Sequence, residues 1–284
     1  MTEKHLTPGR IILYIVLIIA SVATVYPFLW MISASFRPLA EIVGGNMSLF
    51  STNMTMENYS YVLGLTSLFP RWFLNSFMVA LIGTTLNLIM NSMAGYSLAR
   101  LSFPGRNKIY FALLALIMVP AQVLLIPNFI IMNSLRMLDT YAAIIMPAAV
   151  NISYIFLMRQ FFLNFSTDVE EAASIDGLGR YSLFFRMSLP LARPAIATQS
   201  VFVFMGFWNE FTRPMLYLRT PELFTVTLGL QTFSSRDAGT QWAQVMAAAC
   251  ISVLPIVAIY FIFNKFFLTG VRMNGKKHIR SGHF

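Results

Sequence analysis

Residues 165–190 read FSTDVEEAASIDGLGRYSLFFRMSLP and form a polar stretch in a chain that is otherwise strongly apolar. Four of the chain's 11 aspartates and glutamates lie between residues 168 and 176. A charged side chain at the centre of a bilayer's hydrocarbon core costs at least about 2.5–3.5 kcal/mol. The stretch is therefore predicted to be an aqueous loop between membrane spans.

The middle of this loop has the pattern of a short capped helix. Thr167 and Glu170 fit a capping box, and the acidic residues of the first turn match the positive end of the helix dipole. Gly177 then supplies a left-handed stop. The apolar surface of the expected helix is small and consists of Val169, Ala172, Ala173 and Ile175. Alanines let another protein surface approach the backbone, which favours a docking helix; the alternative is an ordinary interfacial helix.

The composition indicates an integral membrane protein. Of the 284 residues, 57% are hydrophobic and 11% are charged, and the mean hydropathy is +0.67, as in membrane proteins. The single cysteine, Cys250, lies in a predicted span, which excludes a disulfide framework and a cysteine metal site. The formal charge of +9 is compatible with nucleic-acid binding, but the cations lie at span ends. Membrane topology explains them better, so no nucleic-acid partner is expected.

Six apolar runs predict an all-α, polytopic membrane protein. They cover residues 11–35, 72–98, 109–134, 141–158, 194–217 and 243–268. The third run is expected to be interrupted at Pro120 and Pro127, and Pro194 is expected to open the fifth. The first run is too long for a cleaved signal peptide, and Pro27-Phe28-Leu29-Trp30 replaces the small-residue cleavage site.

Six spans place both termini on one side, and the basic residues indicate which side. Fourteen of the 20 lysines and arginines lie in the amino end, the loop 100–108, the polar loop and the tail, or within six residues of them. The positive-inside rule therefore places both termini and the polar loop in the cytoplasm. The expected organisation is a cytoplasmic amino end (1–10), a transmembrane domain (11–270) with the polar loop at 163–193, and a basic cytoplasmic tail (271–284).

The sequence contains no recognisable catalytic constellation. It has no G-x-x-x-x-G-K-[ST] phosphate loop, no H-E-x-x-H and no G-x-S-x-G. The three histidines, His5, His278 and His283, lie in the terminal tails and cannot form a metal site in a span. We therefore expect no catalytic residue, no metal and no cofactor, with energy supplied by another protein.

The polar loop resembles the EAA loop of binding-protein-dependent ABC-transporter permeases. The pattern is Glu171-Ala172-Ala173-x-x-x-Gly177, nine further residues, then Met187-Ser188-Leu189-Pro190. Asp176, Phe184 and the run Phe207-Trp208-Asn209-Glu210-Phe211 look like the carbohydrate-uptake branch, in particular its maltose-type second permease. Met187 stands where an isoleucine-like residue is usual, which is a conservative departure. The resemblance covers nearly the whole chain.

This resemblance implies the six-helix permease fold of type I ABC importers, with the chain forming half of the translocation pore in a cytoplasmic membrane. It implies a second homologous permease, two cytoplasmic ATP-binding subunits that bind the ATP, and an extracytoplasmic sugar-binding protein. The ATPase-coupling helix would contain Glu170, Glu171, Ala172, Ala173, Asp176 and Gly177. Capping remains an alternative role for Glu170, and helix termination remains one for Gly177.

Polar residues inside the spans form a second candidate site. Glu210 is the one carboxylate well inside a predicted span, and an intramembrane acid is a functional-site hypothesis because lipid exposure is costly. Amides match sugar hydroxyls, and aromatic faces pack on pyranose rings. The sequence thus predicts a sugar pathway near Gln199, Trp208, Asn209 and Glu210. The alternatives are a structural bend before Pro214 and hydrogen bonding between helices, which is the favoured role for Asn75, Asn87, Asn91, Gln122 and Asn151.

Other function classes fit less well. Within the same branch, the substrate could be glycerol-phosphate or a polyol. An ion-coupled secondary transporter would need intramembrane acids or broken-helix repeats, and the chain offers Glu210 and no evident repeat. A membrane-embedded enzyme would need a paired nucleophile and base or a metal set, which the sequence does not contain.

Overall fold

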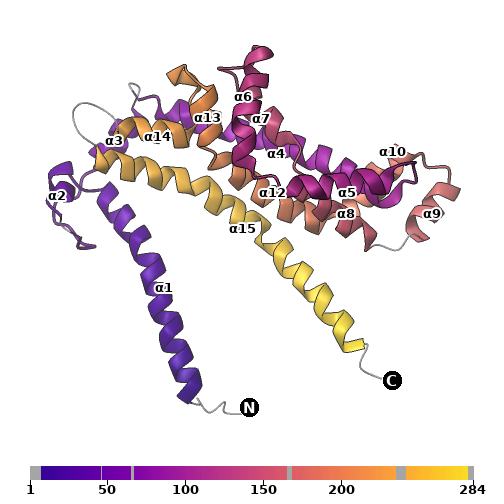
Figure 1. Ribbon diagram of the computed structural model, residues 1–284. Helices are drawn as coiled ribbons and strands as arrows, with labels where there is room; N and C mark the ends of the chain where they lie inside the picture. The colour runs from indigo at the N-terminus through magenta and orange to yellow at the C-terminus, as the bar shows by residue number, and fades with distance from the viewer. Residues whose placement is uncertain (1–7, 46, 65–66, 165–167, 235–240, 281–284) are drawn as a thin grey trace. The chain divides into compact units, whose positions relative to one another are not determined.

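The computed structural model describes residues 8–45, 47–64, 67–164, 168–234 and 241–280, which form helices and loops with no β-strand among them (Figure 1). The predicted all-α class is confirmed. The chain divides into two compact units. One contains Met1–Pro70 and Gly229–Leu254, and the other contains Arg71–Leu228 and Pro255–Phe284.

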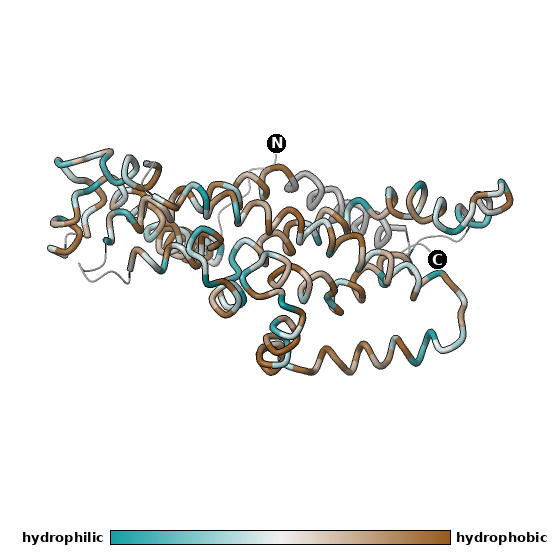
Figure 2. Tube along the Cα trace, turned by 90° about the horizontal axis from the view of Figure 1, so that it is seen from above, coloured by the Kyte–Doolittle hydropathy of each residue, from teal (hydrophilic) through white to brown (hydrophobic). Residues whose placement is uncertain are grey.

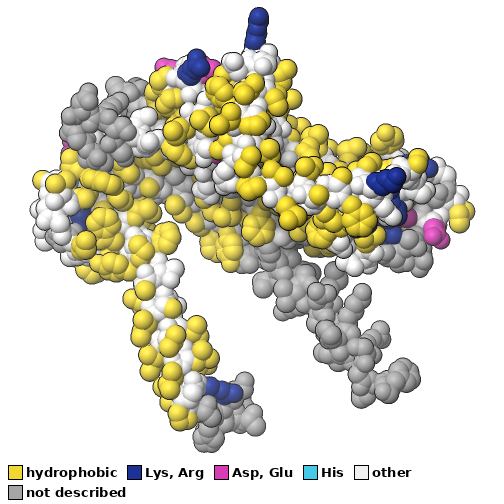
Figure 3. All heavy atoms as spheres, in the orientation of Figure 1, with side chains coloured by type: hydrophobic (Ala, Val, Ile, Leu, Met, Phe, Trp, Pro, Cys, Tyr) yellow, Lys and Arg dark blue, Asp and Glu magenta, His cyan; other side chains and the backbone are white. Residues whose placement is uncertain are grey.

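Among the residues that the structure describes, three helices are long and apolar enough to cross a bilayer on their own. They are α1 (Pro8–Ser35), α4 (Phe69–Arg100) and the part of α15 (Trp242–Arg280) that runs from Trp242 to Ile262. Hydrophobic side chains cover α1 along most of its length (Figure 3), as expected for a helix that faces lipid or another apolar surface. These helices correspond to the first, second and sixth predicted spans.

Two further spans are bent helix pairs. In the first, α5 (Arg106–Ile117) meets η1 (Ala121–Leu124) and α6 (Leu125–Ser134) at 96°. In the second, α7 (Tyr141–Ala149) meets α8 (Ile152–Leu163) at 43°. Counting each pair as one span gives up to five spans by length and composition.

The two bends have local causes in the sequence. Pro120 lies immediately before η1, as predicted, because proline has no N–H to donate and its ring restricts the preceding residue. The expected interruption at Pro127 is wrong, because this residue lies in the first turn of α6. The N–H groups of a first turn have no carbonyl partner within the helix, so proline removes no helical hydrogen bond there. At the second bend, Asn151 caps α8 by accepting a hydrogen bond from the Ser153 N–H (2.9 Å).

The predicted fifth span, residues 194–217, is not one helix. It consists of α12 (Arg193–Trp208) and α13 (Thr212–Tyr217), separated by Asn209-Glu210-Phe211. Pro194 lies in the first turn of α12, as predicted. The 16 residues of α12 extend about 24 Å, which is less than the roughly 30 Å thickness of a bilayer's hydrocarbon core. The chain continues through η3 (Pro221–Leu223) into α14 (Val226–Ser234).

The second unit has an aromatic core around α12. Trp208, Phe204 and Tyr217 are buried there with Ile144 of α7 and Val79 of α4. The Trp208 ring stacks on Phe204 with ring centroids 5.8 Å apart. Apolar residues dominate the helices, whereas many of the hydrophilic residues gather at helix ends and loops (Figure 2). This distribution is the one that a bilayer imposes on spanning helices.

α4 and α8 approach each other closely at Gly95. A Cβ at this position would lie 2.7 Å from the Met158 Cβ and 2.9 Å from the Arg159 backbone nitrogen. Small residues at helix contacts let two backbones approach in this way inside membranes. The Arg159 guanidinium then lies 3.9 Å from the centroid of the Tyr110 ring and connects α8 to α5.

Asp139 connects the turn between α6 and α7 to the loop after α13. Its Oδ1 accepts hydrogen bonds from the N–H groups of Arg219 (2.8 Å) and Thr220 (3.0 Å), and its Oδ2 accepts the Thr220 hydroxyl. These donors favour the ionised carboxylate, so the hydrogen bond from the Thr220 side chain, followed by the two backbone hydrogen bonds, lowers the pKa of Asp139 below its ordinary value.

In the first unit, the segment after α1 carries α2 (Leu39–Val43) and α3 (Glu57–Leu63). Two buried polar side chains hold this segment together. Arg37 is fully buried, and the buried Asn58 amide donates hydrogen bonds to the carbonyls of Ser35 (2.9 Å) and Arg37 (2.8 Å). The described residues of the predicted polar segment 37–71 therefore form an ordered structure.

Asp139 is expected to make the stability depend on pH. Its pKa is lower in the folded state than the ordinary value of 3.8, so its stabilising contribution is present above that value and is lost as the pH falls through the folded pKa. Asp139→Asn should lower the thermal unfolding temperature near neutral pH and weaken its pH dependence below about pH 4. Unfolding of the detergent-solubilised protein across this pH range measures the effect. Asp176→Asn, at an exposed acid, is the control, and a wild-type profile in Asp139→Asn would contradict the role.

Gly95→Ala should destabilise the contact between α4 and α8. The added methyl group would collide with the α8 backbone, and overpacking of this kind costs about 1–3 kcal/mol. Gly206→Ala in α12 is a matched control, because a Cβ there meets no atom within 4 Å. Thermal unfolding in detergent should therefore show a clear loss for Gly95→Ala and little change for Gly206→Ala. Equal unfolding temperatures for the two variants would show that α4 and α8 can move apart at Gly95 without a loss of stability.

Candidate ATPase-coupling helix and polar membrane site

The predicted helix of the polar loop is present as α9 (Asp168–Ile175). Gly177 has φ +86° and follows the helix as the left-handed residue that the sequence predicts. The Leu178 N–H donates a hydrogen bond to the Ala173 carbonyl (3.1 Å), which closes the helix end as a Schellman motif. Thr167 lies outside the described residues, so the amino-terminal half of the capping box stays a prediction.

Glu170 attaches α9 to two other parts of the second unit. Its Oε1 accepts a hydrogen bond from the Ser188 hydroxyl (2.8 Å), and its Oε2 lies 3.6 Å from Nε of Arg100 at the end of α4. The Arg100 and Glu170 side chains are only 9% and 18% exposed, so water screens the ion pair less than at an open surface. The described contacts of this carboxylate favour an anchoring role over simple capping.

Ser188 belongs to the second part of the loop, which returns to the membrane helices. That part consists of α10 (Arg180–Leu183), the π-helical turn η2 (Phe184–Ser188) and α11 (Leu189–Leu191). Phe184 is buried and packs its ring against Tyr96 of α4 and Phe162 of α8, with ring centroids 5.2 Å and 6.4 Å apart. The loop is thus held by an aromatic cluster in addition to Glu170.

The described side chains of α9 separate into an inner and an outer set. Ala173 is buried, so its methyl group faces its own chain rather than a partner. Glu171, Asp176 and Gly177 are exposed, and Ile175 is 86% exposed. The side chains of Val169 and Ala172 lie outside the described residues. The surface that α9 offers to another protein therefore includes an apolar residue beside acidic ones.

The predicted polar residues of the fifth span do not form one cluster. Gln199 is buried and donates a hydrogen bond from Nε2 to Oδ1 of Asn87 (3.0 Å). Trp208 is buried in the aromatic core, where it also meets Phe73 edge to face. Asn209 is exposed at the end of α12. These positions indicate packing roles for Gln199 and Trp208.

Glu210 lies at a cavity of about 220 Å³ in the second unit and forms an ion pair with Arg213 (2.7 Å). The cavity is also lined by the amides Asn87 and Asn151 and by Tyr154, together with Ala148, Phe202, Val203, Gly206 and Phe207. Of the four predicted pathway residues, Glu210 alone lines this cavity. Arg213 and Tyr154 were not predicted; the spacing of Glu210 and Arg213, three residues apart, is the sequence signal that could have indicated their pairing.

Several asparagines bond between segments, as the alternative interpretation expects. The Asn75 amide donates to the carbonyls of Glu222 (2.8 Å) and Phe224 (3.0 Å), and the Asn87 amide donates to the Ala148 carbonyl (2.9 Å). Asn91 bonds to the Ala149 carbonyl and accepts the Asn151 N–H (3.0 Å). Gln122 differs, because its side chain is exposed on η1. Among the described residues, no group of three or more His, Cys, Asp or Glu side chains is placed to hold a metal ion.

Comparison with known proteins decides the family. Residues 91–273 match the model of the family described as binding-protein-dependent transport system inner membrane component. The chain belongs to this family. The matched region contains α9, the Glu170 contacts and every residue that lines the cavity at Glu210 except Asn87. The protein is therefore a multi-pass membrane permease.

Two related permeases align with almost the whole chain. It is 33% identical over 255 residues to the arabinooligosaccharides transport system permease protein AraQ of Halalkalibacterium halodurans, a match covering 89% of this chain and 91% of the relative. It is 30% identical over 271 residues to the lactose transport system permease protein LacG of Rhizobium radiobacter, covering 95% and 98%.

A solved structure has the same fold. A chain from a bacterial ABC transporter involved in the import of the acidic polysaccharide alginate superposes with a TM-score of 0.85, at 24% sequence identity. The match covers 94% of the permease and 99% of the other chain. The ABC importer permease fold that the sequence predicts is thereby confirmed.

Removal of the Glu170 carboxylate should loosen α9. A hydrogen bond to a charged group contributes about 1.5–3 kcal/mol, so Glu170→Ala should speed amide hydrogen exchange in α9 by roughly tenfold or more. Exchange mass spectrometry of residues 168–175 measures this. Glu171→Ala is the matched control, because the Glu171 side chain is exposed on the same helix, and its exchange should change much less. Equal acceleration in the two variants would contradict the anchoring role.

Proposed function

We propose that this permease is a subunit of an ATP-driven, binding-protein-dependent importer of oligosaccharides. The family supplies the transport class, and the relatives named above are permeases for arabinooligosaccharides and lactose. The chain forms half of the pore and pairs with a second homologous permease. Two cytoplasmic subunits bind and hydrolyse the ATP, so the permease itself carries no cofactor and no catalytic residue.

The observation that carries the proposal is that α9 is anchored to its own chain and still exposes side chains on its surface. A moving ATPase can transmit force only through an element that is stiff and also accessible. Glu170 ties α9 to Arg100 and Ser188, while Glu171 and Ile175 remain exposed to a partner. Motion of a groove that holds α9 would thus reach α4 directly and would reach α12 through the loop that contains Ser188.

The orientation follows from the distribution of basic residues. With both termini and α9 in the cytoplasm, α9 faces the compartment that contains ATP. The segments 41–69 and 219–242 then lie on the outer side, where they would receive sugar from an extracytoplasmic binding protein. ATP binding by the partners would displace α9 and open the pore outward; this requires contacts that differ between the two states.

The cavity at Glu210 is the best-supported position for this subunit to line the sugar pathway. Its amides can donate hydrogen bonds to sugar hydroxyls and accept hydrogen bonds from them, and its carboxylate can accept them. Tyr154 and Phe207 offer aromatic surface for a sugar ring. The Glu210–Arg213 pair disfavours an ion-coupled mechanism, because a carboxylate compensated at 2.7 Å is poorly suited to bind and release a cation on its own. A glycerol-phosphate or polyol substrate stays an alternative within the same class.

Gly177→Pro tests the coupling role directly. Gly177 has φ +86°, whereas proline is restricted to φ near about −65°, so the end of α9 cannot keep its geometry. We expect the assembled importer to insert normally and to lose both sugar uptake and the ATP hydrolysis stimulated by the binding protein. Reconstituted vesicles allow both rates to be measured.

Gly177→Asn is the matched control, since asparagine tolerates the left-handed conformation better than other residues. It should keep most of the uptake and of the stimulated ATP hydrolysis. Normal uptake by Gly177→Pro would refute the coupling role of α9. Uptake that persists without any ATP-hydrolysing partner would refute the transporter class.

A further inference from the structure

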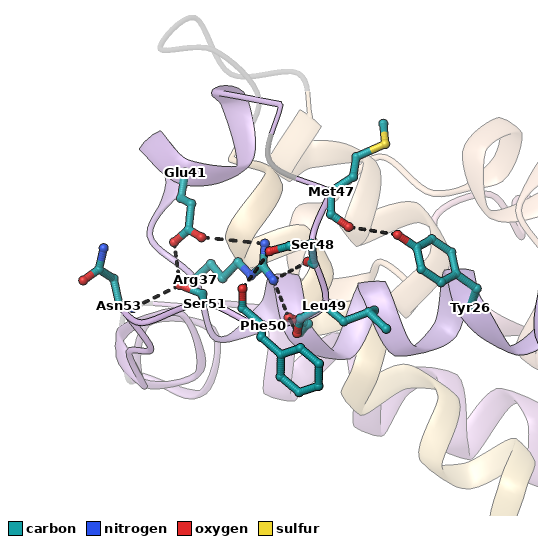
Figure 4. A network of polar contacts seen from close by, with 10 residues as sticks. Tyr26, Arg37, Glu41, Met47, Ser48, Leu49, Phe50, Ser51 and Asn53 are labelled. Atoms are coloured by element: carbon teal, nitrogen blue, oxygen red, sulfur yellow. Dashed lines mark hydrogen bonds and ion pairs between the residues drawn. The ribbon is translucent and has the colours of Figure 1, made fainter.

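In the first unit, residues 47–50 fold back along the end of α1 and form a segment that we call the strap (Figure 4). The Tyr26 hydroxyl donates a hydrogen bond to the Met47 carbonyl (2.9 Å), and the Ser33 hydroxyl donates one to the Leu49 carbonyl (2.7 Å). Tyr26 lies nine residues before the end of α1 at Ser35, which is about 14 Å along the helix axis. The strap therefore does not project away from α1 but lies beside its final turns.

All four carbonyl groups of the strap accept hydrogen bonds from side chains. In addition to the two bonds from α1, the Ser48 carbonyl accepts Nη2 of Arg37, and the Phe50 carbonyl accepts the Ser48 hydroxyl (2.7 Å). A loop in water can leave its carbonyls to solvent. In hydrocarbon, each unsatisfied backbone group costs several kcal/mol, so the chain must supply every donor itself.

Arg37 is the centre of this arrangement. Its side chain is fully buried, donates a second hydrogen bond to the Ser33 hydroxyl (2.8 Å) and lies 3.7 Å from Oε1 of Glu41. Glu41 in turn accepts the Ser51 hydroxyl through Oε2 (2.7 Å). Ser33, Glu41, Ser51 and the Ser48 carbonyl are thus linked around one buried guanidinium.

Two of the three apolar side chains of the strap, Met47 and Phe50, point the other way, whereas Leu49 is half-buried. Met47 is 71% exposed and Phe50 is 85% exposed, and both are directed away from Arg37 (Figure 4). Val43, at the end of α2, is 68% exposed as well. An ordered segment with its polar groups inside and its large apolar groups outside has the polarity expected of a surface in contact with lipid.

The position along α1 agrees with lipid contact. Arg10 lies near the amino end of α1, and Tyr26 follows 16 residues later, which corresponds to about 24 Å of helix. A bilayer's hydrocarbon core is about 30 Å thick. With Arg10 at the cytoplasmic boundary, Tyr26 and the Met47 carbonyl that it binds lie at the outer edge of the core, where tyrosine is enriched.

We propose that the strap is inserted into the outer leaflet, at the boundary between lipid headgroups and acyl chains, with Met47 and Phe50 in contact with lipid. The buried Arg37 and the hydroxyls of α1 hold the strap at this depth. The strap anchors the beginning of the outer segment to the bilayer. This inference depends on α1 spanning the membrane and is independent of the transported solute.

Spin labels can measure the environment of the strap in the intact importer in phospholipid vesicles. In a Cys250→Ala background, single cysteines at Met47, Phe50 and Asn53 each receive a nitroxide. Collision rates with oxygen, which concentrates in lipid, and with a water-soluble nickel chelate then report the surroundings. We expect high oxygen and low nickel accessibility for labels at 47 and 50, and the reverse at the exposed residue 53.

Two results would overturn the proposal. High nickel accessibility at 47 and 50 would place the strap in water, and low accessibility to both reagents would place it under another protein, such as the second permease. A further variant tests the role of the satisfied carbonyls: Tyr26→Phe removes one donor to Met47 and should raise nickel accessibility at 47 and leave 53 unchanged. Tyr14→Phe, the same change lower on α1, should change neither site. An unchanged label at 47 in Tyr26→Phe would also count against the proposal.

Discussion

A backbone group inside a bilayer has no water to bond, and this constraint governs the places where the chain departs from a regular helix. At the bend between α7 and α8, the amides of Asn87 and Asn91 on α4 bond to the carbonyls of Ala148 and Ala149. After α12, the Thr227 hydroxyl bonds to the Glu210 carbonyl (2.7 Å). Breaks in the helices are therefore tolerated because side chains from other segments replace the lost hydrogen bonds.

The same rule explains why the polar side chains inside the spans serve two purposes. Asn87 bonds to Ala148 and Gln199 and also lines the cavity that contains Glu210. The Asn87 amide bonds to a carbonyl at the bend between α7 and α8 and is at the same time a fixed hydrogen-bonding group beside the proposed pathway. If the cavity at Glu210 belongs to the sugar pathway as proposed, Asn87 would combine its structural role with a binding role that the sequence did not indicate.

Much of the architecture could be predicted from local sequence patterns. The apolar runs give the helices of the first, second and sixth spans, and the acidic cluster followed by Gly177 gives α9 and its left-handed end. The break at 209–211 appeared in the sequence only as the alternative of a bend before Pro214, because three residues change the hydropathy of a long apolar run very little. Pro127 was misjudged because the effect of a proline depends on where its helix begins.

The contacts that define the candidate sites were harder to predict because they join distant segments. Arg100 and Glu170 are 70 positions apart in the sequence and meet only once α4, α8 and the loop have packed. Asn91 and Asn151 are a similar case. Arg37 follows two residues after the first predicted span, and nothing in its immediate neighbours indicates that it is fully buried. Local sequence patterns thus predict helices and their ends, whereas the contacts between distant side chains depend on how the helices pack.

The close approach at Gly95 limits how this subunit can deform. Two helices separated by long side chains can slide past each other, since the side chains change rotamer as the contact shifts. At Gly95 the backbones are in direct contact, with no long side chains between them, so we expect α4 and α8 to move together. α8 leads toward α9, and α4 carries Arg100. If α9 couples to an ATPase as proposed, force on it would therefore reach a rigid pair of helices rather than a hinge. The compliance that any change of shape requires is then left to the bends at Pro120 and at residues 209–211.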